Sequence, residues 1–87
     1  MMNYETTFKI EILKEYGASI SAAFSRYADE KNIDFDDDFH PVIQAKREAA
    51  VISRKLIGSS DAQISGIKNR LGELKEYLFE VNPDAII

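Results

Sequence analysis

The most regular feature of the sequence is a series of apolar residues near its C-terminal end. Their spacing is 3, 4, 3, 4 and 3 positions, and they are Ile64, Ile67, Leu71, Leu74, Leu78 and Val81. Such spacing places the side chains in one stripe along a helix. Asn82-Pro83 then ends the pattern, because a residue that precedes proline disfavours the helical conformation. The pattern therefore predicts a helix over about residues 61–81.

A second apolar stripe lies immediately before this one. Its members, spaced 3, 4, 3 and 4 positions apart, are Val42, Ala45, Ala49, Ile52 and Leu56. Pro41 suits a first helical turn, so the pattern predicts a helix over about residues 39–57 with Asp38 or His40 as its N-cap. Only residues 58–60 separate the two helices. So short a connection predicts an antiparallel hairpin whose two apolar stripes face each other.

The N-terminal third has a less regular pattern. Its apolar residues at helical spacing are Leu13, Tyr16, Ile20, Ala23 and Tyr27, with Phe24 beside them. They predict a helix over about residues 7–31, although Lys9 then falls in the middle of its apolar face. Phe8, Ile10 and Ile12 alternate with polar residues, which is the period of a strand. Residues 6–12 thus remain open between helix and strand, and a strand would pair only across a dimer.

These patterns together predict an all-α protein with a three-helix arrangement. The antiparallel hairpin (about 39–57 and 61–81) packs on an N-terminal helix (about 7–31), residues 1–87 form a single helical domain, and a homodimer stays open. The predicted core consists of Leu13, Ile20, Phe24, Tyr27, Val42, Ala49, Ile52, Leu56, Ile64, Ile67, Leu71, Leu74 and Leu78.

Composition narrows the class of protein. The 87 residues are 45% hydrophobic and 30% charged, which is typical of a folded chain rather than a disordered one. The absence of cysteine excludes disulfides and thiolate chemistry. No apolar run approaches the roughly 20 residues of a membrane span, and the first residues lack the pattern of a signal peptide. We therefore expect a cytoplasmic protein with no membrane partner.

Charge is distributed unevenly along the chain. The net charge is −4, but residues 1–39 carry −5, residues 40–75 carry +4 and residues 76–87 carry −3. An acidic total argues against broad nucleic-acid binding, which depends on the neutralisation of phosphates. The simplest interpretation is that these segments form solvated faces of helices.

Motifs for catalysis or for a cofactor are weak. Residues 34–38 read D-x-D-D-D, which resembles the opening of a calcium loop, but Phe39 and Ala45 occupy the positions of its glycine and its bidentate glutamate. His40 is the single histidine, so it cannot build a zinc site alone. The glycines form no phosphate-binding loop. We expect no metal, no cofactor and no enzymatic activity.

Four candidate surfaces for a partner remain. They are the acidic loop Asp36, Asp37 and Asp38; the basic stripe Arg47, Arg54 and Lys55; the small polar residues Ser65, Asn69 and Gly72; and the aromatic residue Tyr77. Glycine within an exposed helix costs up to ~1 kcal/mol relative to alanine. Gly66 and Gly72 would be explained if the N-terminal helix or a second chain approached closely, and otherwise they simply face water.

The favoured functional hypothesis is a non-catalytic protein-interaction module. It would be a small adaptor, an assembly factor or a stoichiometric inhibitor, and one concrete version presents acidic surfaces to a nucleic-acid-binding partner. The alternative is a small nucleic-acid-binding accessory protein that uses the basic stripe of the second helix. A third hypothesis, an enzyme assembled from several copies, would need His40 in a shared pocket.

Overall fold

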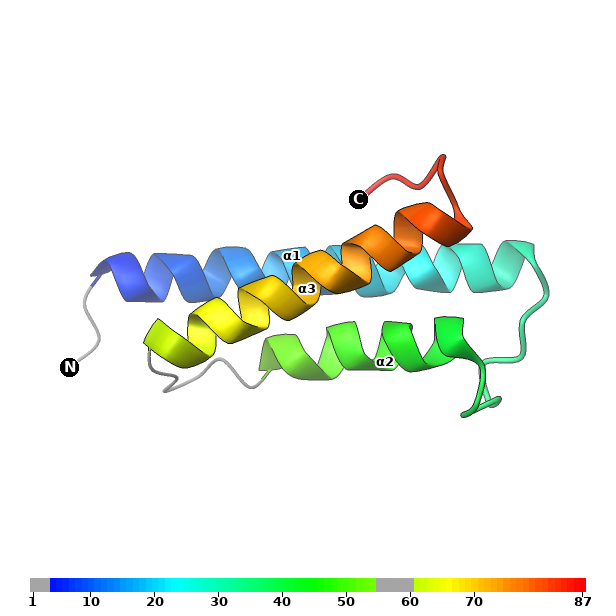
Figure 1. The fold of residues 1–87 in the computed structure, drawn as a ribbon, viewed down its shortest axis with the longest axis horizontal. Helices are drawn as coiled ribbons and strands as arrows, with labels where there is room; N and C mark the ends of the chain where they lie inside the picture. Colours follow the sequence, from blue (N-terminus) through cyan, green and yellow to red (C-terminus); the bar gives the residue numbers. More distant parts are fainter. Residues whose placement is uncertain (1–3, 55–60) are drawn as a thin grey trace.

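The computed structural model of the chain describes residues 4–54 and 61–87, with side chains at 8–52, 54 and 62–87. It contains three helices, α1 (Tyr4–Glu30), α2 (Pro41–Arg54) and α3 (Asp61–Val81), and no strand among the described residues. They form an elongated bundle of 45 × 24 × 15 Å in which α2 runs antiparallel to α1 and α3 (Figure 1). The prediction of an all-α, three-helix arrangement is confirmed.

Local hydrogen bonds explain where the helices end. Asn32 adopts a positive φ of 55°, and the Ile33 N–H donates to the carbonyl oxygen of Ala28 at 2.8 Å, which closes α1 in a Schellman motif. At the start of α2, Nδ1 of His40 accepts a hydrogen bond from the N–H of Val42 at 3.1 Å. His40, rather than Asp38, is therefore the N-cap. Residues 6–12 are helical, which settles the alternative of a strand.

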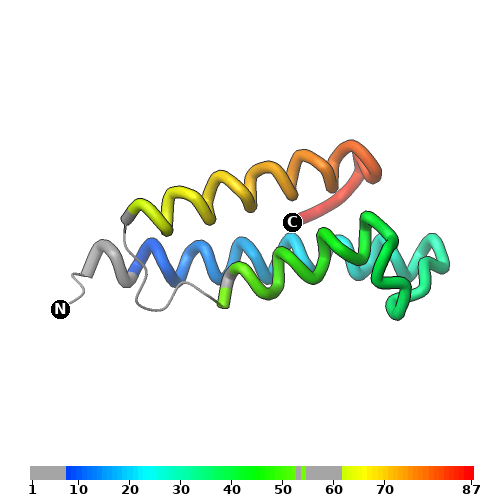
Figure 2. Tube along the Cα trace, turned by 60° about the horizontal axis from the view of Figure 1, so that its bottom comes forward, coloured from blue at the N-terminus to red at the C-terminus, as the bar shows by residue number. Residues whose placement is uncertain are grey.

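The structure differs from the predicted hairpin, because α2 and α3 are not the two helices that pack most closely. The largest interface joins α1 to α2, the next joins α1 to α3, and the smallest joins α2 to α3 (Figure 2). A hydrogen bond from the Ser21 hydroxyl to the carbonyl oxygen of Lys46, at 3.1 Å, crosses the α1–α2 interface. The expectation that the stripes of α2 and α3 mainly face each other is wrong, because both are packed principally on α1. The predicted connection at 58–60 lies outside the described residues.

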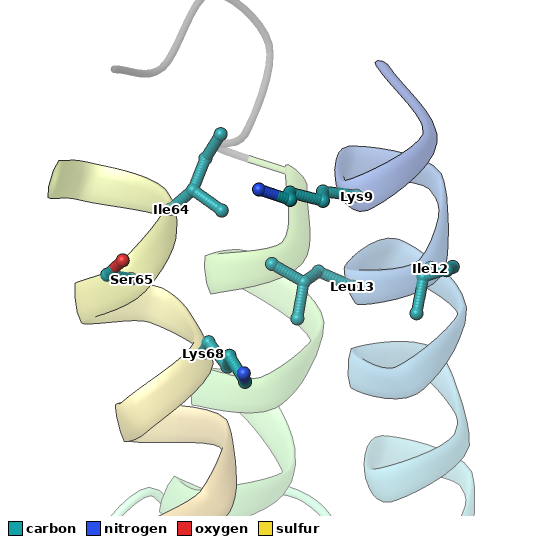
Figure 3. A pocket seen from close by; sticks show the side chains of 6 residues that line it. All are labelled: Lys9, Ile12, Leu13, Ile64, Ser65 and Lys68. Atoms are coloured by element: carbon teal, nitrogen blue, oxygen red, sulfur yellow. The ribbon is translucent and has the colours of Figure 1, made fainter. Parts of the chain in front are cut away.

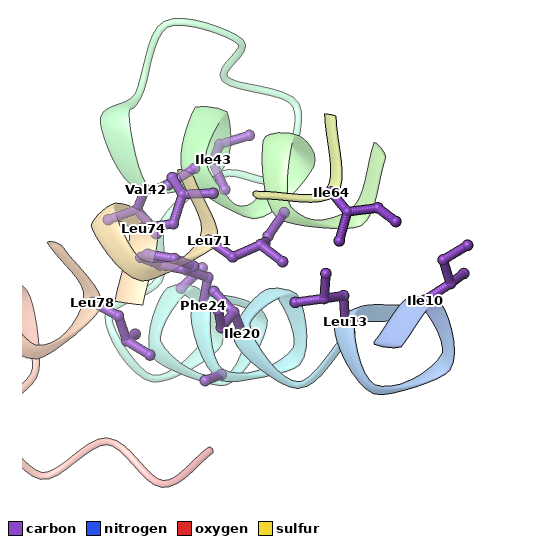
Figure 4. Close-up of a cluster of buried hydrophobic side chains, with 14 residues drawn as sticks. Ile10, Leu13, Ile20, Phe24, Val42, Ile43, Ile64, Leu71, Leu74 and Leu78 are labelled. Carbon is purple, nitrogen blue, oxygen red and sulfur yellow. The ribbon is translucent and has the colours of Figure 1, made fainter. Parts of the chain in front are cut away.

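The core lies along α1, between the other two helices (Figure 4). Nine predicted core residues are buried, and they are Leu13, Ile20, Phe24, Val42, Ala49, Ile64, Leu71, Leu74 and Leu78. Tyr27, Ile52 and Ile67 are half-buried against this cluster, and Leu56 lies outside the described residues. The core also includes residues that the prediction omitted: Ile10, Ala23, Ala28, Ile43 and Ala45.

Candidate partner-binding surfaces

The acidic loop connects α1 to α2, and two of its carboxylates build its shape. Oδ1 of Asp34 accepts a hydrogen bond from the N–H of Asp36 at 2.9 Å. Oδ1 of Asp37 accepts one from the N–H of Phe39 at 3.1 Å. Both are Asx turns, in which a short acidic side chain stands in for a backbone acceptor. The carboxylate of Asp36 and the ring of Phe39, which is 88% exposed, are left on the surface of the loop.

The basic stripe of α2 meets this acidic loop. Arg47 forms an ion pair with Asp38, and its Nη2 donates to the carbonyl oxygen of Phe35 at 3.0 Å. Nζ of Lys46 lies 5.6 Å from the centre of the Phe35 ring. Two surfaces that the sequence suggested as separate are thus joined, and part of the charge of the stripe is already balanced within the chain.

Of the other two residues of the stripe, the structure describes Arg54. Arg54 is exposed at the end of α2, whereas Lys55 lies outside the described residues. His40 has its Nδ1 occupied by the capping hydrogen bond to Val42. It therefore caps the N-terminus of α2.

A groove lies between the N-terminal halves of α1 and α3 (Figure 3). It has a volume of about 390 Å³, and it is lined by Lys9, Ile12, Leu13, Ile64, Ser65 and Lys68. Buried Leu13 and Ile64 form its floor, and Lys9 extends from α1 toward α3. A second hollow of about 530 Å³ shares Ile12, Leu13 and Lys68 and continues past Asn69 and Gly72.

The two glycines of α3 face open space. A Cβ atom built on Gly66 or on Gly72 would meet no heavy atom within 4 Å. The idea that α1 approaches these glycines closely is therefore wrong, and approach by a second chain stays a prediction. Ser65 and Asn69 are exposed, and together with Gly72 they form the low wall of the groove on the α3 side.

Sequence reasoning missed this groove because it needs two helices that are distant in the sequence. The available signal was Lys9, a charged residue in the middle of an apolar pattern. In the structure Lys9 is exposed at the edge of the groove, so the apolar face and the lysine do not conflict.

An ion-pair cluster links α2 to α3. The Arg70 guanidinium binds Glu48 through two nitrogen atoms, with Nη2 at 2.7 Å from Oε1, and its Nη1 donates to Oε2 of Glu73 at 3.0 Å. The hydrogen bonds from Arg70 lower the pKa of Glu48, and the bonded Glu48 in turn raises the pKa of Arg70. The cluster therefore favours the charged form of both groups.

Tyr77 is a packing residue more than an exposed anchor. Its ring stacks on that of Phe24, with centroids 5.9 Å apart and an angle of 29° between the planes. It is half-buried, and burial raises the pKa of its phenol, with Tyr27 and Glu80 adding to the effect. Phe79, its neighbour on α3, is 36% exposed.

Two further observations concern metals and membranes. Within residues 8–52, 54 and 62–87, no three His, Asp or Glu side chains are grouped so that they could hold a metal ion. In the same part of the chain, none of the helices is long and apolar enough to cross a bilayer.

The fold and its surfaces define a small all-helical protein whose candidate functional features are surfaces for a partner. The chain matches the family described as bacterial epsilon antitoxin over residues 2–81, and it belongs to that family. It is also similar to the antitoxin PezA of Streptococcus pneumoniae serotype 4, with 46% identity over 41 residues. That match covers 47% of this chain and 26% of PezA, about a quarter of the relative's length. No solved structure matches the chain.

Proposed function

We propose that this chain is an antitoxin that inhibits a protein toxin by binding to it in a fixed ratio. The observation that carries the proposal is the family match, which spans all three helices. The similarity to PezA supports the same role, within the 41 residues that it covers. In this proposal, the partner of the interaction module that the sequence predicted is a toxin protein.

In support of this proposal, the structure has an ordered surface that a protein partner could bind. The loop between α1 and α2 is held by two Asx turns and by Arg47, so little conformational entropy is lost when a partner contacts it. Exposed aromatic residues are frequent anchors at protein interfaces, and Phe39 is presented on this ordered loop.

The direct test uses the toxin that co-purifies with the tagged chain from its native host and that arrests growth when produced alone. We expect co-production of wild-type chain to restore growth. The matched control is Leu71→Asp, which places a charge in the core and unfolds the bundle, so it should restore nothing. If wild-type chain, shown to be folded by circular dichroism, leaves the arrest unchanged, the antitoxin proposal is wrong.

The acidic version of the interaction is testable at the loop. In the double variant Asp36→Asn and Asp37→Asn, asparagine keeps an acceptor oxygen for the turn while two charges disappear. If these carboxylates steer association, the on-rate for the toxin should fall at low salt and the difference from wild type should shrink at high salt. Equal on-rates at low salt would contradict a role for these charges.

Four finer hypotheses stay predictions. Two of them concern nucleic acid: either the toxin binds it, or this chain contacts it directly through Arg47, Arg54 and Lys55. Each predicts an affinity for nucleic acid that falls steeply as the salt concentration rises. The second of these finds less support, because Arg47 is paired with Asp38. Self-association can be measured by light scattering, which separates a 9.9 kDa monomer from a dimer. A cytoplasmic location is expected of such an inhibitor.

A further inference from the structure

We propose that the groove between α1 and α3 receives one amphipathic, acidic helix of the toxin. The proposal deepens the antitoxin function and rests on it. Its occupant has an apolar stripe that faces the floor of the groove and Asp or Glu residues that reach the two lysines, Lys9 and Lys68.

The shape of the groove suits a helix. Its two hollows share Ile12, Leu13 and Lys68, so they form one continuous channel along α3. From Ile64 to Glu76 the channel extends for roughly 18 Å, the length of about three helical turns. Buried Leu13 and Ile64 form the floor, and the side chain of Ile12 is 48% exposed at the α1 edge. An apolar stripe on an incoming helix would remove this surface from water.

The side chains on the α3 side of the channel are small, so the backbone of a partner helix can approach α3 closely. Two helices that pack with small residues at their contact have axes at the short end of the usual range of about 8–10 Å. Ser65, Asn69 and Gly72 are the residues at this wall, and nothing lies within 4 Å of a Cβ built on Gly72. The space beside Gly72 is thus available to a partner and is not used by the described part of the chain.

Charge determines the chemistry of the partner. Lys9 and Lys68 stand on opposite walls at one end of the channel (Figure 3), and none of the six side chains that line this end is a carboxylate. At the other end Glu73 and Glu76 line the channel, and Glu73 is paired with Arg70. Tyr16 lines this end too, and Nζ of Lys75 lies 6.0 Å from the centre of its ring. The lysine end therefore carries unbalanced positive charge among its lining groups, which favours carboxylates on the occupant.

The first experiment fills the channel without harming the fold. Gly72→Leu places a side chain in the channel, and Gly66→Leu places the same side chain at a position of α3 that does not line it. Both changes replace glycine in a helix by a better helix former, so both variants should melt at or above the wild-type temperature. We expect Gly72→Leu to weaken binding of the purified toxin by at least about tenfold, and Gly66→Leu to stay within about twofold.

The second experiment tests the charges. Lys9→Glu and Lys68→Glu should each weaken toxin binding by about tenfold, whereas Arg26→Glu, a charge reversal at an exposed residue of α1 that lines neither hollow of the channel, should not. Lys9→Arg and Lys68→Arg keep the charge and should retain binding.

The outcomes separate this proposal from the antitoxin function. If wild-type chain binds and inhibits the toxin while Gly72→Leu and both charge reversals bind equally well, the groove proposal is overturned and the antitoxin function stands. If Gly72→Leu changes the mass of the free chain in light scattering but not its affinity for the toxin, the occupant is a second copy and the proposal is again overturned. If wild-type chain does not bind the toxin, the proposed function itself fails.

Discussion

Arg47 shows how one side chain changes the interpretation of two surfaces. From the sequence it belongs to a basic stripe, and Asp38 belongs to an acidic loop 9 positions away. In the structure they pair, because the start of α2 turns the loop back beside the first turns of that helix. Helical spacing predicts which residues share a face, but it does not predict how a neighbouring loop folds onto that face. Helical spacing likewise does not predict which side chains of two helices meet, so the sequence identified Tyr77 as a candidate without showing its stacking on Phe24.

A prediction at the level of the residue concerns Leu71, which has no exposed surface. Leu71→Ala removes apolar contacts and leaves a cavity that the surrounding side chains fill incompletely, so it should lower the free energy of unfolding by about 2–5 kcal/mol. The measurement is urea denaturation followed by circular dichroism. Ile12→Ala, at a half-exposed position of α1, serves as the control and should cost far less. A Leu71→Ala midpoint equal to that of wild type would show that the side chain does not lie in the core.

The helices themselves were largely predictable from the sequence. The pattern placed α3 at 61–81, as observed, and it placed the start of α2 within two residues of Pro41. Apolar periodicity carried that information, together with Asn82-Pro83 and Pro41. The order of packing was not predictable, because α2 has apolar residues on more than one face. Ile43 and Ala49 are both fully buried, and either helix neighbour could have covered them.

A prediction at the level of the elements concerns the link between α2 and α3. Arg70 lowers the pKa of Glu48, so folding stabilises the charged carboxylate. This contribution is fully present above the ordinary glutamate pKa, near 4.3, and is lost as the pH falls through the lowered pKa of the folded state. Because Glu48 is 37% exposed, solvent screens the pair and we expect only about 0.5 kcal/mol.

The variant Glu48→Gln isolates this effect. Its melting temperature should lie slightly below that of wild type at pH 7, and the two curves should converge as the pH falls through the lowered pKa of Glu48. Lys31→Gln, which removes an exposed charge outside the cluster, should leave the shape of the pH curve unchanged. A constant difference between Glu48→Gln and wild type from pH 7 to pH 3 would mean that the ion pair with Arg70 does not stabilise the fold.

At the level of the whole molecule, α1 supports both candidate surfaces. The acidic loop follows the C-terminal end of α1, and the groove lies beside the N-terminal half of α1. The two surfaces are therefore at opposite ends of a bundle 45 Å long (Figure 1). A toxin that contacts both would span most of the length of the bundle. Such an arrangement favours inhibition by occupation of an extended surface, and each inhibited toxin molecule would retain its antitoxin.

Titration of the toxin with the chain tests this central claim most directly. The residual activity of a fixed amount of purified toxin is measured while wild-type chain is added, at concentrations well above the dissociation constant. We expect activity to fall linearly and to reach its minimum at a fixed whole-number ratio, with a complex of the same ratio in light scattering. Complete inactivation by a small fraction of one equivalent, or activity that persists in the presence of excess folded chain, would contradict the account.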